Sequence, residues 1–348
     1  MLFAAPSFTP RERLLTVIVL ANVAITSILL LSSGAAPLSE KLDNRIEGID
    51  ISTARYIDLT HAIEPGMPLW GAFAQPIFSA ARAAVGMDGF IATGEEFTYA
   101  KQGFVATEVT IPTDQIGTQL DVPAHWNDWG ATLTDVPATV TLRPLVVVDI
   151  TDGVRSDPGY HAQVEDVERW EEAHGKVPNG SVVLFRSDWS RGWVEYTRTG
   201  KMPDAFPGVS LAALKFLHGE RQILVHGHEP LDTDMTPSLE GEAWLMHNNF
   251  MQIEGVANLH QVPPKGCLLS IGFAKIAGAA GGLARLVAVC PANSLHGATI
   301  AGEPGAPLPQ QPYPLQRGDD GVLRPTADAV PTSYCKEGVG SPLGCPLP

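Results

Sequence analysis

Helical periodicity is confined to a few stretches of a chain that otherwise alternates short apolar runs with turn-rich loops from Tyr56 onward. In residues 164–175, Val164, Val167 and Trp170 share one face and acidic side chains occupy the other, which predicts an amphipathic helix. Glycine and proline follow this stretch and predict its end. Few helices among many short strands are typical of an α/β fold.

Apolar, strand-like runs follow the predicted helices directly. The helix at 164–175 leads into the run 181–189, and a second predicted helix at 211–220 leads into the run 221–227. A helix that returns the chain to a neighbouring strand is the usual connection between parallel strands. We therefore predict an α/β fold with a mixed sheet and flanking crossover helices. Further core strands are expected at residues 142–150 and 284–290.

The N-terminal segment has the layout of a secretory signal. Arg11 and Arg13 precede an apolar run at residues 14–31, and small residues follow it. We predict that residues 1–36 are a signal peptide, or else an uncleaved anchor, because the run is about as long as the shortest spans that cross a bilayer. In either case we expect the domain at residues 37–302 to be secreted or periplasmic.

The C-terminal segment, residues 303–348, has a different composition. Ten of the 29 prolines fall between Pro304 and Pro348, with few apolar clusters among them. Such a segment buries little apolar surface, so we predict a proline-rich tail rather than a second domain.

Acidic residues outnumber basic ones, 38 to 23, for a formal net charge of −15. Such a surface repels phosphate backbones, and the sequence has no cluster of Lys and Arg to offset it. We therefore expect no nucleic-acid partner, and contact with a membrane only through an N-terminal anchor. A small molecule is the expected ligand.

The chain has four cysteines, Cys267, Cys290, Cys335 and Cys345, and no CxxC pair. An even number in an oxidising compartment favours disulfides. We expect Cys267 to pair with Cys290, because they end two predicted strands whose antiparallel pairing would set those ends opposite each other. Cys335 would then pair with Cys345. Buried free thiols are the alternative.

The candidate chemistry lies in the sequence QIGTQLDVPAH, which begins at Gln115. The polar side chains of Gln115, Gln119 and Asp121 recur at intervals of two or four residues. In an extended backbone such side chains project to one face, and Pro123 stiffens the bend that returns His125 to the same place. A carboxylate and an imidazole together can hold a metal ion and activate water. A loop Asp that caps backbone amides beside a surface His is the alternative.

This segment resembles the H-x-G-T-H-x-D-x-P-x-H motif of the cyclase family of metal-dependent hydrolases, which includes bacterial kynurenine formamidases and isatin hydrolases. Residues 56–70, 181–189 and 226–234 also look like family segments in the family's order, and the likeness covers about residues 54–292. The resemblance implies the family's swivelling β/β/α fold, with a mixed, barrel-like sheet and flanking helices. It also implies a homo-oligomer.

The resemblance assigns metal ligands to this chain position by position. The family's bridging carboxylate falls on Asp121, its next ligand or base on His125, and a later glutamate ligand on Glu254. A further family histidine corresponds to either His247 or Glu242. We prefer His247, because imidazole is the better ligand for zinc or manganese.

Two residues depart from the family motif: Gln115 and Gln119 stand where the motif has histidines. An amide oxygen is a poorer ligand than imidazole, so we expect one manganese or zinc ion per chain rather than two. The two glutamines remain candidate ligands for a harder cation. They are also candidate donors to an oxyanion. Loss of metal binding altogether is the alternative.

Three aromatic residues are candidates for substrate binding. His61 lies where the family has a polar residue near the site, although it is also compatible with a loop histidine. Trp70 follows a turn and is placed either to wall a pocket or to join the core. His228 ends an apolar strand, where site residues are frequent, or else only hydrogen-bonds the turn.

The resemblance implies a hydrolase that cleaves an amide or ester, often a lactone, formamide or cyclic amide, in the manner of an arylformamidase. His125, Asp121 and Glu254 are its expected catalytic residues. The sequence has no G-x-S-x-G motif, which argues against a serine esterase of the α/β-hydrolase type. The alternatives are a metal-free acid–base hydrolase or lyase at the same pocket, and an exported protein that binds small molecules without turnover.

Overall fold

The computed structural model describes residues 49–300, 315–319, 321 and 323–325, in which the largest feature is a sheet that closes on itself. The order of its strands is β12, β11, β5, β7, β9, β10 and β4, and β4 pairs again with β12 to close the ring. β1 pairs with the other end of β12. These strands span β1 Arg55–Asp58, β4 Gln119–Asp121, β5 Leu142–Asp149, β7 Val182–Arg186, β9 Val225–His228, β10 Met251–Glu254, β11 Cys267–Phe273 and β12 Gly281–Cys290.

Helices connect the strands that run parallel. β5, β7, β9 and β10 are parallel neighbours, and the other pairs of the ring are antiparallel. The chain passes through α3 and α4 between β5 and β7, through α5 and α6 between β7 and β9, and through α7 before β10. The predicted crossover helices are therefore confirmed. These helices span α3 Thr151–Ser156, α4 Val164–His174, α5 Trp193–Thr199, α6 Leu211–Lys215 and α7 Glu240–His247.

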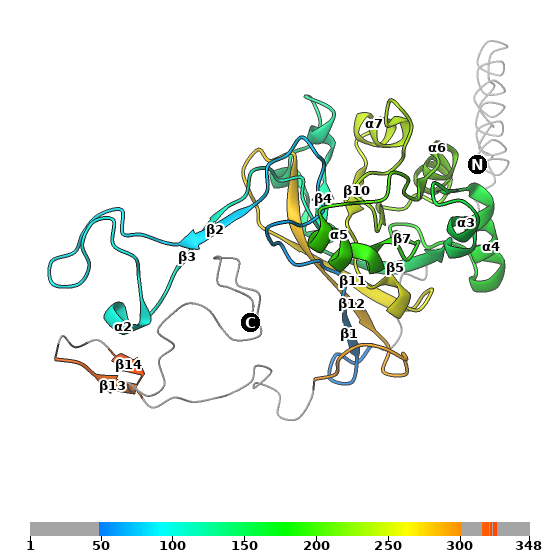
Figure 1. Ribbon diagram of the computed structural model, residues 1–348. Helices are drawn as coiled ribbons and strands as arrows, with labels where there is room; N and C mark the ends of the chain where they lie inside the picture. The colour runs from blue at the N-terminus through cyan, green and yellow to red at the C-terminus, as the bar shows by residue number, and fades with distance from the viewer. Residues whose placement is uncertain (1–48, 301–314, 320, 322, 326–348) are drawn as a thin grey trace, which may run out of the picture. The chain divides into compact units, whose positions relative to one another are not determined.

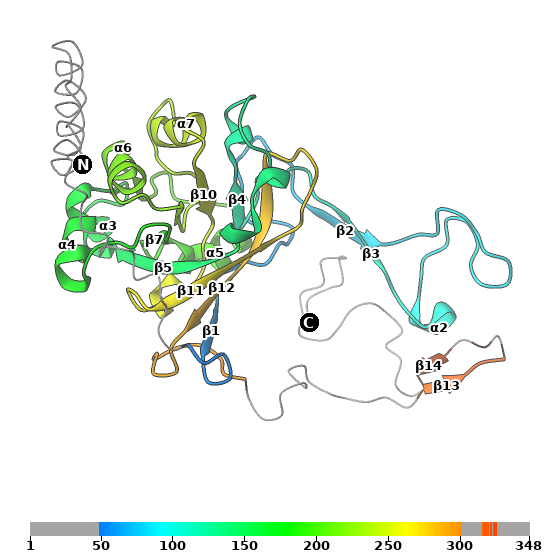
Figure 2. The same ribbon diagram turned by 180° about the vertical axis from the view of Figure 1, so that it is seen from behind.

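The helices α3, α4 and α6 gather beside β5 and β7, as the two opposite views in Figures 1 and 2 show. α6 is continued by the π-helical turn η5, so that the two together fill the predicted helix at 211–220. The other described elements are short: β2 Ile77–Ala80, β3 Thr107–Thr110, β6 His161–Ala162, β8 Gly208–Val209, β13 Leu315–Arg317, β14 Leu323–Pro325, α2 Tyr99–Gln102, η1 Pro123–His125, η2 Leu133–Asp135, η3 Ala138–Val140, η4 Trp189–Gly192, η5 Phe216–Glu220 and η6 Leu259–Gln261.

Alternate side chains of the strands enter two separate apolar cores. One core takes residues from every strand of the ring, including Leu120 of β4 and Leu184 of β7. On β7 the intervening residues Val183 and Phe185 join the second core, where they pack with side chains of the helices such as Trp170. Because side chains alternate across a strand, the outer face of β4 and β10 is also set apart from the first core. On those two strands the outward residues are polar.

The loop before β4 lies directly against the loop after β10. Thr118 Oγ1 donates a hydrogen bond to the carbonyl oxygen of Gly255 (2.6 Å) and accepts one from the backbone N–H of His61 (2.9 Å). Gly117 and Gly255 have φ values of +67° and +60°, and a Cβ on Gly255 would lie 2.3 Å from the Gly117 oxygen. Only glycine allows this approach. The contact fixes the ends of β4 and β10 relative to each other.

A disulfide joins Cys267 of β11 to Cys290 of β12. The antiparallel register sets Leu268 opposite Val289, so that the two cysteines fall at the same end of the pair, as the sequence pattern predicts. Cys335 and Cys345, the segment 1–36 and most of the proline-rich tail lie outside the described residues. In the part of the chain that the structure describes, no helix is both long and apolar enough to cross a bilayer.

Candidate metal centre and substrate cavity

Two paired strands present four buried polar side chains on one face. In the antiparallel pairing of β4 with β10, Gln119 lies opposite Glu254 and Asp121 lies opposite Gln252. Leu120, between the two β4 residues, points into the apolar core, so alternation directs its neighbours to the opposite face. The spacing of Gln119 and Asp121 in the sequence predicts this shared face. Two neighbouring strands thus place two carboxylates and two amides side by side.

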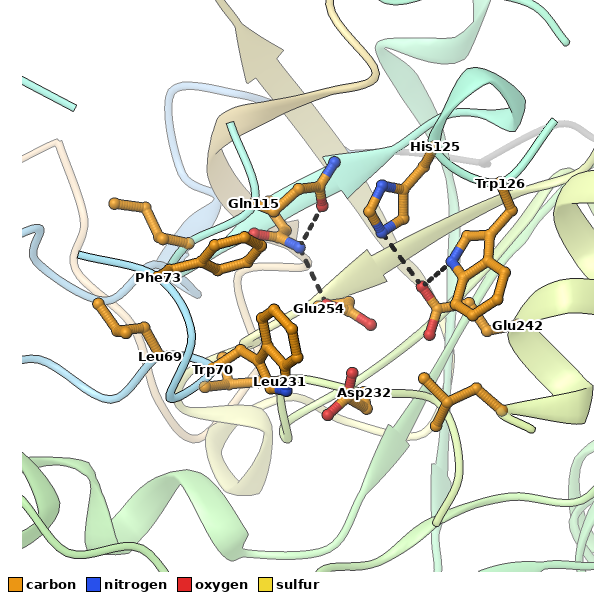
Figure 3. Close-up of a pocket in the computed structure, with 13 residues that line it drawn as sticks. Leu69, Trp70, Phe73, Gln115, His125, Trp126, Leu231, Asp232, Glu242 and Glu254 are labelled. Carbon is orange, nitrogen blue, oxygen red and sulfur yellow. Dashed lines mark hydrogen bonds and ion pairs between the residues drawn. The ribbon is translucent and has the colours of Figure 1, made fainter. Parts of the chain in front are cut away.

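The turn η1 and the helix α7 bring further side chains to these residues. His125 follows Pro123 in η1, and its Nε2 lies 3.6 Å from Oε1 of Glu242 in α7. Trp126 donates a hydrogen bond from its indole nitrogen to the same Glu242 oxygen (2.9 Å). Figure 3 shows His125 and Trp126 approaching Glu242 from one side of the cavity, with Glu254 across from them. The bond from Trp126 fixes one oxygen of Glu242 and leaves the other directed elsewhere.

Asp121, Glu242 and Glu254 form a cluster of buried carboxylates, here called the acidic triad. One oxygen from each lies within 4.8 Å of the others. Burial is the largest cause that raises the pKa of Asp121 to about 7 and of Glu242 to about 8, and repulsion by Asp121 adds to the second. Burial and the same repulsion raise the pKa of Glu254 well above its usual range. Three negative charges this close and this deeply buried require protons or a cation to balance them.

Three side-chain oxygens at the acidic triad have no hydrogen-bond partner within the described part of the chain. They are Oδ1 of Asp121, Oε2 of Glu242 and Oε1 of Gln119. A buried oxygen without a donor is costly, and a cation held by the triad would give the Asp121 and Glu242 oxygens a partner. The residues present therefore fit a divalent cation. Carboxylate and amide oxygens suit a hard cation such as manganese or magnesium better than zinc, which prefers imidazole and thiolate.

Amide nitrogens hold the carboxylates in place from the strand side. Gln252 Nε2 donates to Asp121 Oδ2 (3.1 Å) and to Glu254 Oε1 (2.8 Å). Gln119 Nε2 donates to Glu254 Oε2 (2.9 Å) and to Gln115 Oε1 (2.8 Å). The hydrogen bonds from Gln252 and Gln119 lower the pKa of Asp121 and so partly oppose the effect of burial. Asp121 and Glu254 are consequently fixed in position, and the free Asp121 oxygen remains available to a ligand.

A buried hydrogen-bonded chain supports Gln252 from behind. Thr233 Oγ1 donates to Gln252 Oε1 (2.5 Å), and His228 Nε2 lies 3.1 Å from the same hydroxyl. Nδ1 of His228 lies 3.1 Å from the carbonyl oxygen of Pro230. Burial lowers the pKa of His228 to about 4, so this imidazole is neutral. His228 was predicted to contact substrate, but the structure places it behind Glu254 and outside the cavity lining, where it supports the site.

His61 and His247 also lie apart from the cavity lining. His61 stacks on Trp193, with the ring centroids 3.8 Å apart, because the loop before β4 draws it there. His247 is exposed at the end of α7, and its Nδ1 lies 2.8 Å from the carbonyl oxygen of Ala243. The structure therefore corrects the preference for His247 as a ligand. It brings Glu242 to the acidic triad instead, because residues five apart on a helix point in different directions.

A cavity of about 460 Å³ opens onto the acidic triad. Trp70, predicted as a wall, does line it, and about 60% of its side chain remains exposed at the rim. A cavity of this size and largely apolar character suits a small aromatic molecule. The apolar lining is Leu69, Trp70, Phe73, Ile116, Trp126, Leu231 and Leu239, and the polar lining is Gln115, Gln119, His125, Asp232, Glu242 and Glu254.

The sequence prediction did not include Gln252 or Asp232. Gln252 is separated from Glu254 by one residue, so a strand ending at Glu254 directs both to the same face, and that spacing could have revealed it. Asp232 follows the end of β9, and the end of a strand that neighbours the site is a frequent place for functional residues.

Comparison with known proteins defines the class. The cyclase family model, described as "Putative cyclase", matches residues 57–235, slightly more than half of the chain. The protein belongs to this family, and the resemblance predicted from the sequence is confirmed. The isatin hydrolase of Roseibium aggregatum is 26% identical over 204 residues, which cover 54% of this chain and 76% of that protein.

Solved structures of isatin hydrolases share the fold. Isatin hydrolase A from Ralstonia solanacearum is 27% identical with a TM-score of 0.57, over 68% of this chain and 92% of that one. Isatin hydrolase A from Labrenzia aggregata bound to benzyl benzoate gives a TM-score of 0.58 at 24% identity, over 76% of this chain and 99% of that one. The predicted α/β fold with a barrel-like sheet is confirmed.

Proposed function

We propose that the protein is a hydrolase that uses one divalent cation, held by Asp121, Glu242 and Glu254, to cleave an amide or ester bond of a small molecule. One observation carries the proposal: three buried carboxylates lie within 4.8 Å of one another, two of them with an unpartnered oxygen, and two of them, Glu242 and Glu254, line an apolar cavity beside His125. The similarity to isatin hydrolases supports this reaction class and favours a cyclic amide or a lactone as substrate. When bound, the cation would supply Lewis acidity toward the substrate carbonyl and the attacking water.

His125 is placed to act as the general base. Burial is the main cause that lowers its pKa, so the imidazole is neutral at physiological pH and can accept a proton. It lines the cavity beside Glu242, where the water would attack the substrate. His125 then returns the proton to the leaving nitrogen or oxygen. General-base catalysis of this kind contributes about 10²- to 10⁴-fold to the rate.

Gln115 is a candidate donor to the developing oxyanion once its amide turns toward the cavity, because its Nε2 is buried beside Gly281 in the structure. Its Oε1 is occupied by the hydrogen bond from Gln119, while its buried Nε2 has no acceptor within the described part of the chain. The side chain also lines the cavity. An N–H donor that reaches the carbonyl oxygen would lower the barrier when negative charge appears there during attack. The departure from the family motif at this position thus supplies a group that a metal-ligating imidazole could not.

A metal-free acid–base hydrolase or lyase is the second candidate, and one observation favours it. The amide nitrogens of Gln119 and Gln252 already bridge Asp121 and Glu254 without a cation. The pKa of Glu242, raised to about 8 chiefly by burial, leaves this carboxyl protonated at neutral pH and able to donate a proton. The two candidates differ in whether chelation removes activity.

The deciding experiment measures metal content and hydrolysis on the same preparations. Residues 37–348 would be purified as wild type, Asp121→Asn and Glu254→Gln, incubated with manganese, desalted and analysed for bound metal. We expect about one manganese per wild-type chain and clear loss in both variants. A screen of aryl lactones, formanilides and isatin before and after chelation should show activity that chelation removes. If the wild-type protein binds no manganese but hydrolyses a substrate, the metal-free enzyme is favoured. If it binds no manganese and hydrolyses nothing, both the metal-dependent and the metal-free hydrolase are contradicted.

The disulfide between Cys267 and Cys290 supports the proposal that the protein is exported, because such bonds persist mainly in oxidising compartments. Intact mass of the protein recovered from a periplasmic or culture-medium fraction would test this. A mass that lacks about the first 36 residues is expected for a cleaved signal, whereas recovery only in the cytosol would contradict export.

A further inference from the structure

Asp232 is a carboxylate of the cavity that has no partner in the part of the chain that the structure describes. It lies in the loop after β9, is half-buried and lines the cavity. Among the described residues nothing donates a hydrogen bond to it or forms an ion pair with it, unlike Asp234 in the same loop, which accepts hydrogen bonds from Thr236 and Gly241. Figure 3 shows the Asp232 carboxylate pointing into the same cavity as Glu242 and Glu254. A charge in this position favours a partner supplied by a ligand.

A cation in the metal centre would leave Asp232 uncompensated. The acidic triad consists of Asp121, Glu242 and Glu254, and Asp232 does not belong to that group of mutually close carboxylates. The triad alone has enough negative charge to balance a divalent ion. Asp232 therefore keeps its own charge whether or not a metal is bound. Its pKa is raised to about 6, chiefly by burial and then by Asp234, which still leaves it ionised at neutral pH.

The rest of the lining lacks a positive side chain to pair with Asp232. Among the described residues, no Lys or Arg and one histidine, His125, line the cavity, and burial keeps that histidine neutral. The walls beyond the carboxylates are apolar and include the aromatic rings of Trp70 and Phe73, which lie near each other edge to face. Aromatic rings and a carboxylate together attract organic cations, the rings through cation–π attraction and the carboxylate through direct pairing.

We propose that the substrate is a small aromatic amide or ester that carries an ammonium group, and that Asp232 binds this group and determines specificity. The proposal rests on the hydrolase function proposed above, because it names the substrate class of that site. The aromatic body of the substrate occupies the apolar part of the cavity near Trp70 and Phe73. The ammonium group pairs with Asp232, and the scissile carbonyl faces the acidic triad and His125.

The same charge distribution disfavours anions. A substrate with a free carboxylate meets the charge of Asp232, and the described residues of the lining include no cationic side chain to hold it. Hydrolysis creates a carboxylate in the product, so repulsion from Asp232 also promotes release of the acid half. The predicted order of affinity is therefore ammonium, then neutral, then carboxylate, for ligands of the same size and shape.

The test uses three probes of matched shape, 2-phenylethylammonium, 2-phenylethanol and phenylacetate, titrated by calorimetry into the purified protein at neutral pH. The variants are Asp232→Asn, which keeps the shape of the side chain, and Asp128→Asn, a control at an exposed acid outside the lining. We expect the ammonium probe to bind wild type and the control at least tenfold more tightly than the alcohol. In Asp232→Asn this preference should fall to about threefold or less, while affinity for the alcohol stays unchanged.

Two results would overturn the proposal: equal affinity for the ammonium and the alcohol in wild type, or an ammonium preference that survives Asp232→Asn. Unchanged binding of the alcohol by the variant shows that the cavity is still folded. The measurement requires no turnover, so its outcome is separate from that of the hydrolase screen. A preference for ammonium without any hydrolysis would support binding by Asp232 and contradict the proposed hydrolase. Hydrolysis without that preference would support the hydrolase and contradict the role of Asp232.

Discussion

The side-chain nitrogen of Gln119 lies 2.9 Å from Oε2 of Glu254 across the β4–β10 pair, at a position where the family motif has a histidine. The strand pairing thus sets an amide donor against a carboxylate where an imidazole would otherwise offer a metal a nitrogen ligand. The donor stabilises the Glu254 carboxylate while contributing at most an amide oxygen to a metal. Hydrogen bonds consequently stabilise part of the charge of the cluster, and the proposed cation would balance the rest.

Returning histidines to the motif should strengthen binding of a softer metal. We expect Gln115→His/Gln119→His to bind zinc about tenfold or more tightly than wild type, because imidazole is a better zinc ligand than an amide. Competition with a chromophoric chelator would measure the affinity. The double substitution Gln115→Leu/Gln119→Leu is the control, since it removes the amides without adding a nitrogen ligand. Zinc affinity of the histidine variant at or below that of wild type would argue against a metal position beside these residues.

The metal-free protein should lose stability as the pH rises. Asp121 and Glu242 have ordinary pKa values of 3.8 and 4.5, and folding raises them to about 7 and about 8. Groups that bind protons more tightly when folded stabilise the fold fully below their unfolded pKa, and this contribution is lost as the pH passes through the folded pKa. Between about pH 5 and pH 8 we expect the free energy of unfolding to fall by on the order of a few kcal/mol.

Denaturant unfolding in the presence of a chelator, at both pH values, would measure this loss. The variant Glu242→Gln removes one of the titrating groups and should show a smaller dependence on pH. Saturating manganese should oppose the loss at high pH, because a cation replaces the protons as the balancing charge. An equal free energy of unfolding at about pH 5 and pH 8 in the presence of chelator would contradict the raised pKa values of the triad carboxylates.

Substitution of His125 should lower turnover but preserve metal binding. We expect His125→Gln to reduce kcat by about 10²- to 10⁴-fold with a substrate identified in the screen, because the general base is lost while all three carboxylates of the triad remain. Steady-state kinetics beside metal analysis would check both parts. His174→Gln, which changes a histidine outside the cavity lining, is the control. Parallel loss of metal and activity would instead identify His125 as a ligand.

The sequence was sufficient to predict the parts of the molecule that local pattern controls. The face shared by Val167 and Trp170 specified the helix α4, and the apolar run around Leu184 specified the strand β7 that follows it. Alternation likewise placed Gln119 and Asp121 on one side of a strand. These features depend on residues close together in the chain, and periodicity reports them directly.

The composition of the site was less predictable, because it depends on contacts between distant segments. The triad joins Asp121 to residues more than a hundred positions later, and the choice between Glu242 and His247 rested on ligand preference without knowledge of how α7 is rotated. Asp232 gave no periodic signal, since it lies in a loop. Rotation of a helix against a sheet and the path of a loop are set by packing, which a single sequence does not display.

The rotation of α7 provides a direct test of the metal centre. Glu242 points one buried, unpartnered oxygen at the site, whereas His247 is exposed on the same helix and contacts the backbone at Ala243. We therefore expect Glu242→Gln to weaken manganese binding by at least tenfold, because one of three charged ligands becomes neutral, and His247→Gln to leave it unchanged. Isothermal titration of manganese into each variant would measure the difference, with circular dichroism as the check on folding. If His247→Gln lost the metal and Glu242→Gln kept it, the assignment of the ligand on α7 would have to be reversed.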